Sequence, residues 1–220
     1  MCLHRTTLLA VCALLLSVSA GSPQGTFEHI NVTFDGPPSQ SPTYARLLQS
    51  YDESGVWFRP IPGTDGFTRQ GSNPPSFYPN NGTMYLQASL GDSLMFGLDD
   101  GSSFDPVSVD LAEYSAILLQ MLGPETVHFV GYRQDGTVLT DDITTAGIFN
   151  GIAPVFQTFY FDPAFSDLVR LEIPIFPSLD NLTLQRSVPE PGTGALLCVG
   201  ALLLGLRLLK PNKSLHSTPR

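Results

Sequence analysis

The sequence predicts an all-β fold, an antiparallel sandwich or barrel, in a chain of 220 residues. Three observations carry this prediction. Apolar and polar residues alternate with a period of two, which is typical of half-buried strands. Clusters of Gly and Pro separate these runs at fairly regular intervals. One connection, Gln134-Asp135-Gly136, has the form of a tight hairpin turn in which Gly136 takes a positive φ.

Ten segments carry the strand pattern. In chain order they are residues 29–35, 55–61, 83–88, 93–98, 107–111, 126–133, 137–140, 155–161, 168–173 and 179–185. The proline-rich segments 36–42 and 73–81 are expected to be loops. Because no repeat or linker divides residues 21–186, we expect one domain there, long enough to bury a core without crosslinks.

The first twenty residues have the form of a secretory signal peptide. Arg5 gives a positive start, residues 8–16 are an unbroken apolar run, and Val18 and Ala20 fit the −3 and −1 positions of a cleavage site. We therefore expect the protein to be exported and the mature chain to begin near Gly21.

A second apolar run lies near the C-terminus, where residues 194–206 carry no charge. At about 1.5 Å per residue this run is shorter than a hydrocarbon core of about 30 Å. Arg207 can snorkel, which extends the span toward Lys210 at the far interface. The sequence predicts one transmembrane helix, with the domain outside and residues 211–220 as a cytoplasmic tail.

The residues before this span form a motif, Pro189-Glu190-Pro191, whose two prolines favour an extended backbone that a protease can bind. With the apolar run, Arg207 and Lys210, it resembles the PEP-CTERM sorting domain of exported bacterial proteins. The resemblance implies that an exosortase-type sorting protease recognises residues 187–210. It also implies removal of the tail and delivery to the cell surface or the exopolysaccharide matrix.

The interior carries a second resemblance. The stretches FDPVSVDLAEYS, VHFVGYRQDGTVLTDDI, FQTFYFDPAFSDLVRLEIP and LDNLTL resemble the β-sandwich region common in PEP-CTERM proteins. Over most of residues 27–185 this implies a jelly-roll-like sandwich, similar to carbohydrate-binding modules. It makes exopolysaccharide a candidate ligand.

Composition excludes some functions for residues 21–186. This segment has six arginines, no lysine and nineteen carboxylates, a net charge of −13 against −9 for the whole chain. Nucleic acid is therefore not an expected partner, since a phosphate backbone needs a basic surface. The three cysteines, Cys2, Cys12 and Cys198, all lie outside this segment, so it has no disulfide and no thiolate metal site.

Asp35 and Asp180 are the candidate metal ligands, at the end of the first expected strand and the start of the last. The jelly-roll resemblance implies that these strands lie side by side and that their carboxylates, with backbone carbonyls, hold a structural calcium ion. The alternative is that Asp35 caps a turn and that Asp180 and Asn181 bond loop backbone. No other cofactor is expected.

Other acidic residues are expected to be solvated turn residues. They are Asp99, Asp100 and Asp105, in a loop without the register of an EF-hand, and Asp141 and Asp142 at the end of the hairpin.

No enzymatic activity is expected. No Gly-x-Ser-x-Gly elbow is present, and His29 and His128 lack a partner at metal-binding spacing. Glu113 and Glu172 are no better a glycosidase pair than other carboxylates, and Glu172 is expected to face solvent beside Arg170.

Several aromatic residues are candidates for stacking on sugar rings. They are Trp57, Tyr44, Tyr51, Phe77 and Tyr78. Because Trp57 alternates with Phe58, one of these two must face the core. The core is favoured for the strand residues, and both roles stay open for Phe77 and Tyr78.

Asn31, Asn81 and Asn181 open N-glycosylation acceptor sequences. In a bacterial protein these are chance matches. They would be true glycosylation sites in an alternative interpretation, in which the chain is a single-pass type I surface glycoprotein of a eukaryote. A secreted glycan-active enzyme is the other alternative.

Overall fold

Residues 27–187 form one compact unit built from antiparallel sheets. The structure, a computed structural model, describes residues 26–37, 41–88, 93–114 and 123–188. Within these ranges every regular element is a strand, and none of them contains a helix long and apolar enough to cross a membrane. The expected signal peptide and the motif, span and tail at residues 189–220 lie outside the described residues.

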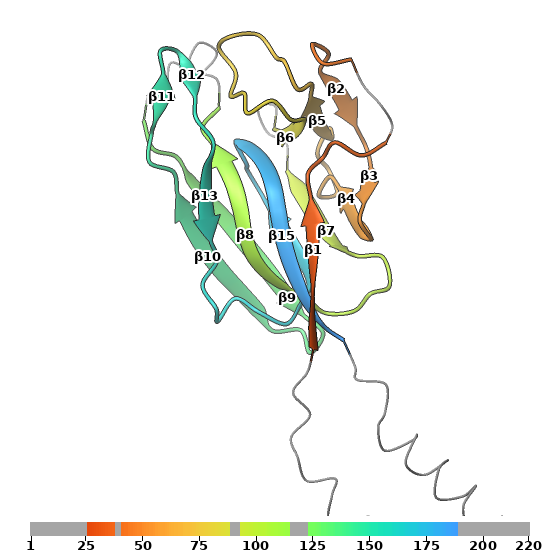
Figure 1. Cartoon of the computed structure of the whole chain (residues 1–220). Helices are drawn as coiled ribbons and strands as arrows, with labels where there is room; N and C mark the ends of the chain where they lie inside the picture. The colour runs from red at the N-terminus through yellow and green to blue at the C-terminus, as the bar shows by residue number, and fades with distance from the viewer. Residues whose placement is uncertain (1–25, 38–40, 89–92, 115–122, 189–220) are drawn as a thin grey trace, which may run out of the picture. The chain divides into compact units, whose positions relative to one another are not determined.

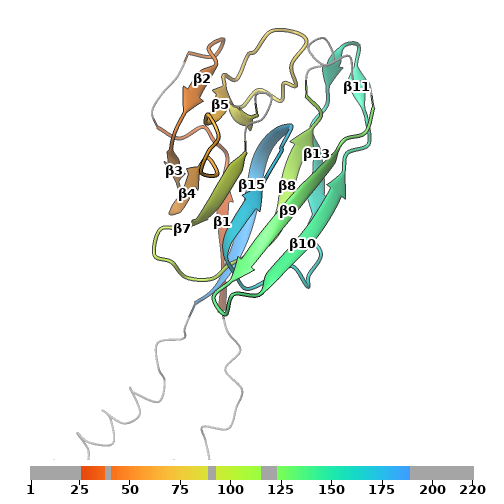
Figure 2. The ribbon, with the colours of Figure 1, turned by 180° about the vertical axis from the view of Figure 1, so that it is seen from behind.

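Two large sheets face each other, as Figures 1 and 2 show from opposite sides. The seven-stranded sheet has the order β13 (Gln157–Tyr160), β8 (Asp105–Ala112), β15 (Ser178–Val188), β6 (Tyr85–Gln87), β5 (Phe67–Gln70) and β2 (Arg46–Leu48), and β1 (Thr26–Val32) also pairs with β15. The six-stranded sheet has the order β10 (Val138–Thr144), β9 (Thr126–Arg133), β14 (Leu168–Ile173), β7 (Leu94–Leu98), β4 (Val56–Arg59) and β3 (Tyr51–Glu53). A two-stranded ribbon joins β11 (Phe149–Asn150) to β12 (Ala153–Pro154). The structure confirms the predicted fold class, an all-β antiparallel sandwich.

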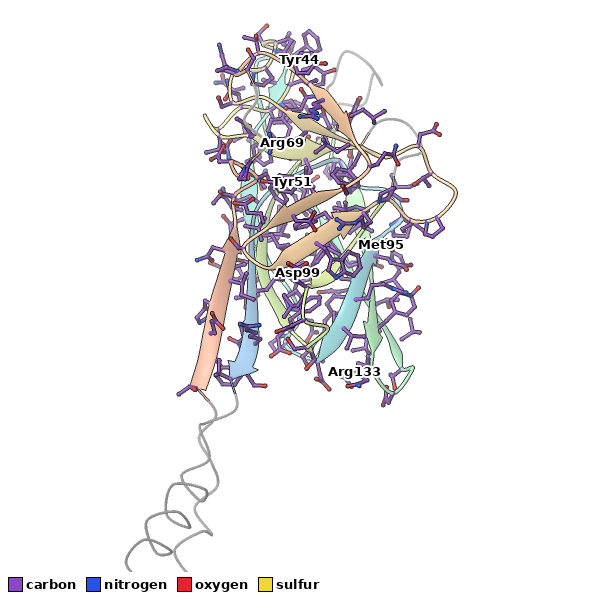
Figure 3. All side chains as sticks on the ribbon, turned by 90° about the vertical axis from the view of Figure 1, so that its right-hand side faces the viewer. Tyr44, Tyr51, Arg69, Met95, Asp99 and Arg133 are labelled. Carbon is purple, nitrogen blue, oxygen red and sulfur yellow. The ribbon has the colours of Figure 1, made fainter. Side chains whose placement is uncertain are left out.

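The first and last strands lie side by side. Arg186 at the end of β15 donates to Glu28 near the start of β1 over 2.8 Å, and Thr183 donates to Asn31 over 3.1 Å. These two contacts run in opposite directions along the strands, so β1 and β15 are antiparallel. The start of β1 and the end of β15 therefore meet at one end of the sandwich (Figure 3).

The core between the sheets is rich in aromatic side chains. Phe58 on β4 packs against Phe34 at 5.3 Å and against Phe96 on β7 at 5.4 Å, and Phe96 stacks on Phe104 at 5.9 Å. All four side chains are almost wholly buried. Each such ring pair contributes roughly 0.5–1.5 kcal/mol beyond its buried area. The row joins segments of both sheets and fixes how they pack.

The strands agree with the predicted segments, since each of the ten overlaps an observed strand. The predicted hairpin is also confirmed: Gly136 has a φ of 85°, and Arg133 N donates to Thr137 O over 2.9 Å. The last strand runs to Val188, two residues past the expected domain boundary. Five strands of two to four residues were not predicted: β2, β3, β5, β11 and β12.

Candidate functional site

Asp180 is the centre of a buried hydrogen-bond network where the seven-stranded sheet meets the turn before β6. Its Oδ2 accepts hydrogen bonds from Asn81 Nδ2 and Thr83 Oγ1, both over 2.7 Å, and its Oδ1 accepts one from Asn181 N. The carboxylate has no exposed surface. Burial raises its pKa to about 6, and the hydrogen bonds from Asn81, Thr83 and Asn181 oppose that rise.

The backbone of β15 is irregular at the same place. The register with β8 shifts between Asp180 and Thr183, and Asn181 has a φ of 45°, which is unusual for a residue other than glycine. Asn181 Nδ2 donates to Asp110 on β8 over 2.8 Å, and Thr158 on β13 donates to the other oxygen of Asp110. The bulge therefore ties three strands together through polar side chains.

Asp35 also contacts this turn. Its Oδ1 accepts a hydrogen bond from Met84 N over 2.9 Å, so Asp35 and Asp180 both hold residues 81–84. These contacts are of the turn-capping kind that was the alternative to calcium. The described part of the chain has no group of three or more His, Cys, Asp or Glu placed to hold a metal. Calcium at this turn stays a prediction.

A second buried polar network continues this region on the outer side of the sheet. Gln70 on β5 donates to Gln87 on β6 over 2.8 Å, and Gln87 donates to Ser178 on β15 over 3.0 Å. Next to it, Tyr85 is wholly buried, packs against Phe156 and has a hydroxyl without a hydrogen-bond partner in the structure. Burial raises the pKa of this hydroxyl. Sequence reasoning missed this network because nothing marks a strand glutamine as buried.

The two glutamates weighed as a catalytic pair have separate structural roles. Glu113, the residue after β8, is fully buried and accepts a hydrogen bond from Gly147 N over 2.7 Å. Glu172, on β14 in the opposite sheet, accepts one from the Tyr132 hydroxyl over 2.9 Å and pairs with Arg170 at 3.1 Å. Glu172 lies beside Arg170 as predicted, but its side chain is only 16% exposed, so the expectation that it faces solvent is wrong.

Buried Glu113 also affects a neighbouring carboxyl group. The pKa of Glu125 is raised, mainly by burial and further by the charge of Glu113. Glu113 Oε2 has no hydrogen-bond partner in the structure. The absence of catalysis stays a prediction.

The aromatic candidates divide between core and surface. Phe58 and Tyr51 are core residues, and the Tyr51 hydroxyl donates to Glu53 over 2.8 Å. Trp57 lies half-buried on the other face of β4, and its Nε1 donates to Leu98 O over 3.2 Å. The expected alternation of Trp57 and Phe58 is therefore confirmed, with Phe58 inside.

The loop aromatics differ in exposure. Tyr44 is 58% exposed, whereas Phe77 and Tyr78 are half-buried and pack on each other at 4.6 Å. The isolated histidines have ordinary positions: His29 is exposed on β1, and His128 pairs with Asp142 across β9 and β10.

Asp99 and Asp100 lie in an exposed turn, as expected. The same expectation is wrong for Asp105, which opens β8, and for Asp141 and Asp142, which lie within β10. Asp100 accepts hydrogen bonds from the backbone and hydroxyl of Ser102 and pairs with Arg186 at 2.8 Å. These contacts with Ser102 and Arg186 lower the pKa of Asp100. Asp141 accepts one from Asp162 N over 2.9 Å.

An open pocket of about 360 Å³ lies among β8, β13, β15 and the loop after β13. Its lining includes Asp105, Tyr160, Phe161, Phe165, Ser166 and Gln185. Tyr160 is 75% exposed, whereas Phe161 and Phe165 are buried. Sequence reasoning placed Tyr160 in a strand but missed its exposure. Alternation with Phe159 and Phe161 was the available signal, because it puts Tyr160 on the face opposite theirs.

Comparison with known proteins identifies no family. No protein-family model and no curated protein sequence matches the chain. Two solved structures are similar over about three quarters of it. One is a mutant of the family 29 carbohydrate-binding module CBM29-2, with 12% identity and a TM-score of 0.33, covering 72% of this chain and 90% of that one. The other is the CBM22-1–GH10 portion of Clostridium thermocellum xylanase 10B in complex with xylohexaose, with 16% identity and a TM-score of 0.27, covering 73% of this chain and 28% of that one. Neither likeness assigns a ligand to this chain.

Proposed function

We propose that the chain is an exported protein whose signal peptide and C-terminal sorting segment deliver an acidic, non-catalytic β-sandwich to the cell surface or the exopolysaccharide matrix. The observation that carries this proposal is the order of features in the sequence. A signal peptide, one domain, Pro189-Glu190-Pro191, an apolar span and the basic residues Arg207 and Lys210 follow one another. The partners are an exosortase-type protease and, before processing, the membrane.

The pairing of β1 with β15 supports a role as a detachable surface domain. The segments before β1 and after β15 are the ones that processing removes, and the contact of Glu28 with Arg186 sits at their boundary. Cleavage outside these strands leaves every core strand in place. A domain cut from its tail at this point keeps its sandwich whole.

The uses of the candidate carboxylates favour a binding or structural role over catalysis. Asp180, Glu113 and Glu172 each hold backbone or side-chain donors of the fold. A glycosidase needs two carboxyl groups on opposite sides of one bond, about 5–9.5 Å apart. Glu113 follows β8 of one sheet and Glu172 lies on β14 of the other, and each holds its own part of the fold.

Binding of matrix polysaccharide is a second candidate function, favoured by one observation. Tyr160 presents an exposed aromatic ring at a pocket that also contains the polar side chains of Asp105, Ser166 and Gln185. Such a domain attaches to the matrix through its own surface after the tail is removed.

The test is to replace Pro189, Glu190 and Pro191 with alanine in a host that has the sorting protease. The apolar span is unchanged, so insertion should persist, but the fixed extended backbone is lost. The full-length protein should accumulate in the membrane with its tail to Arg220 intact. Alanines at residues 212–214 in the tail are the matched control and should be processed as wild type.

Intact mass and fractionation give the answer. Equal mass and location for wild type and the Pro189–Pro191 variant exclude the sorting role and leave a plain membrane tether. The type I glycoprotein alternative predicts glycan mass on the protein and no sorting-protease gene in the same genome.

A further inference from the structure

We propose that the pocket beside Tyr160 binds a single ring of an uncharged sugar, with the ring face on Tyr160 and the hydroxyls toward Asp105 and Gln185. The inference deepens the second candidate function and rests on it. It adds the location of the site, the class of sugar and the residues that select it.

The aromatic wall is available without rearrangement. Tyr160 lies at the end of β13, the edge strand of the seven-stranded sheet, and is 75% exposed. A lone exposed tyrosine needs no explanation. This one borders a pocket whose lining includes the buried rings of Phe161 and Phe165, which stack on each other at 5.9 Å. A pyranose has an apolar face of C–H groups that packs on such a ring.

The polar wall is held in place by the fold. Asp105 Oδ1 accepts a hydrogen bond from Asp167 N over 2.7 Å, and Oδ2 lies 3.4 Å from Gln185 Nε2. The second contact is long, so both groups retain capacity for a ligand. A carboxylate accepts from sugar hydroxyls, and an amide both donates and accepts. This pair therefore matches neighbouring hydroxyl groups on one ring.

The loop after β13, which lines one side of the pocket, is also held in place. Arg133 donates to Ser166 O over 2.9 Å, and Asp162 accepts from Ala164 N over 2.8 Å. Asp167 has a φ of 60°, a conformation that its hydrogen bond to Asp105 holds. A loop fixed in this way loses little conformational entropy when a ligand binds.

The charge and the volume of the pocket restrict the class of sugar that it can bind. Among the described residues that line the pocket, Asp105 is the one with a charge, and the domain is acidic overall. An anionic sugar such as a uronic acid or a sulfated ring would meet repulsion there. A volume of about 360 Å³ is near the lower limit for ligand pockets, which suits one ring better than several.

The test uses the full chain in a sugar-free zwitterionic detergent. The probes are the methyl glycosides of glucose, galactose and mannose, with methyl glucuronide as the charged comparison, and binding is measured by saturation-transfer NMR titration. At least one neutral glycoside should bind, and methyl glucuronide should not. Tyr160→Ala should weaken binding about tenfold or more through loss of the stacking surface. Tyr160→Phe keeps the ring and should stay within roughly twofold of wild type.

Tyr44→Ala is the matched control. Tyr44 is also an exposed tyrosine, and it lies at the opposite end of the sandwich from Arg133, whose guanidinium holds the pocket loop (Figure 3). Binding should be unchanged in this variant. Equal binding by wild type and Tyr160→Ala, preference for glucuronide, or no binding of any neutral glycoside overturns the proposal. If matrix polysaccharide retains Tyr160→Ala as well as wild type, the pocket is not the binding site, but the polysaccharide-binding function stands. If it does not retain wild type either, the binding function itself is overturned.

Discussion

Replacing Asp180 with asparagine should remove a specific part of the pH dependence of stability. Burial raises the pKa of Asp180 from its ordinary 3.8 to about 6. A group with a raised pKa in the folded state stabilises the fold at low pH, and that contribution is lost as the pH rises through the folded pKa. A difference of about two pKa units corresponds to about 3 kcal/mol. Wild type should therefore lose up to about 3 kcal/mol from this group between pH 4 and pH 7.

Urea unfolding at several pH values measures this difference. The sole tryptophan, Trp57, is half-buried on β4 and reports the transition by fluorescence. The wild-type curve of unfolding free energy against pH should fall more steeply than that of Asp180→Asn between about pH 4 and 6.5. Asp65→Asn, at an exposed carboxylate, is the control and should follow wild type.

Two outcomes contradict this reasoning. Parallel curves for wild type and Asp180→Asn mean that the hydrogen bonds from Asn81, Thr83 and Asn181 offset burial completely. A wild-type curve that rises with pH relative to the variant means that those bonds exceed the cost of burial and that the carboxylate is a net stabiliser when ionised.

Three further predictions concern packing, calcium and redox state. Gly97→Ala should lower the free energy of unfolding by about 1–3 kcal/mol, because the new Cβ would lie 2.8 Å from Trp57 Cζ2. Gly123→Ala, which has open space around it, is the control, and equal losses in the two variants would refute the packing argument. If calcium binds at Asp180, the melting temperature should rise with calcium and the rise should vanish in Asp180→Ala. Identical melting curves in calcium and in chelator leave only the turn-capping role. Residues 21–188 contain no cysteine, so their unfolding should be unaffected by reductant. A shift of the unfolding curve on reduction would contradict the prediction that these residues form a core that is stable without crosslinks.

The longer strands could be predicted because apolar and polar side chains alternate along them, as expected for a strand with one face toward the core. Val56 and Phe58 on β4 are buried while Trp57 between them is less so, and this alternation is visible in the sequence. The short strands could not be predicted in the same way. β3 has three residues, and Glu53 at its end accepts hydrogen bonds from distant Thr33 and Phe34. Such contacts between residues about twenty positions apart leave no local pattern.

The candidate site shows the same division. The neighbourhood of Asp35 and Asp180 was expected from the pairing of the first and last strands, and both do hold one turn. The partners that surround Asp180 were not, because nothing local links Asn81 and Thr83 to a residue about a hundred positions later. The jelly-roll-like topology implied by the resemblance stays a prediction beyond the sandwich itself.

The three acceptor sequences for N-glycans have another physical explanation in this fold. Asn81 and Asn181 use their side-chain amides as donors, to buried Asp180 and to Asp110, and Asn31 accepts from Thr183 between the first and last strands. A glycan attached to the Asn81 amide would have to displace that nitrogen from a carboxylate with no exposed surface. Loss of a hydrogen bond to a buried charge costs about 1.5–3 kcal/mol. At Asn81, Thr83 is needed as a second donor to the same carboxylate, which accounts for this Asn-x-Thr spacing without any glycan.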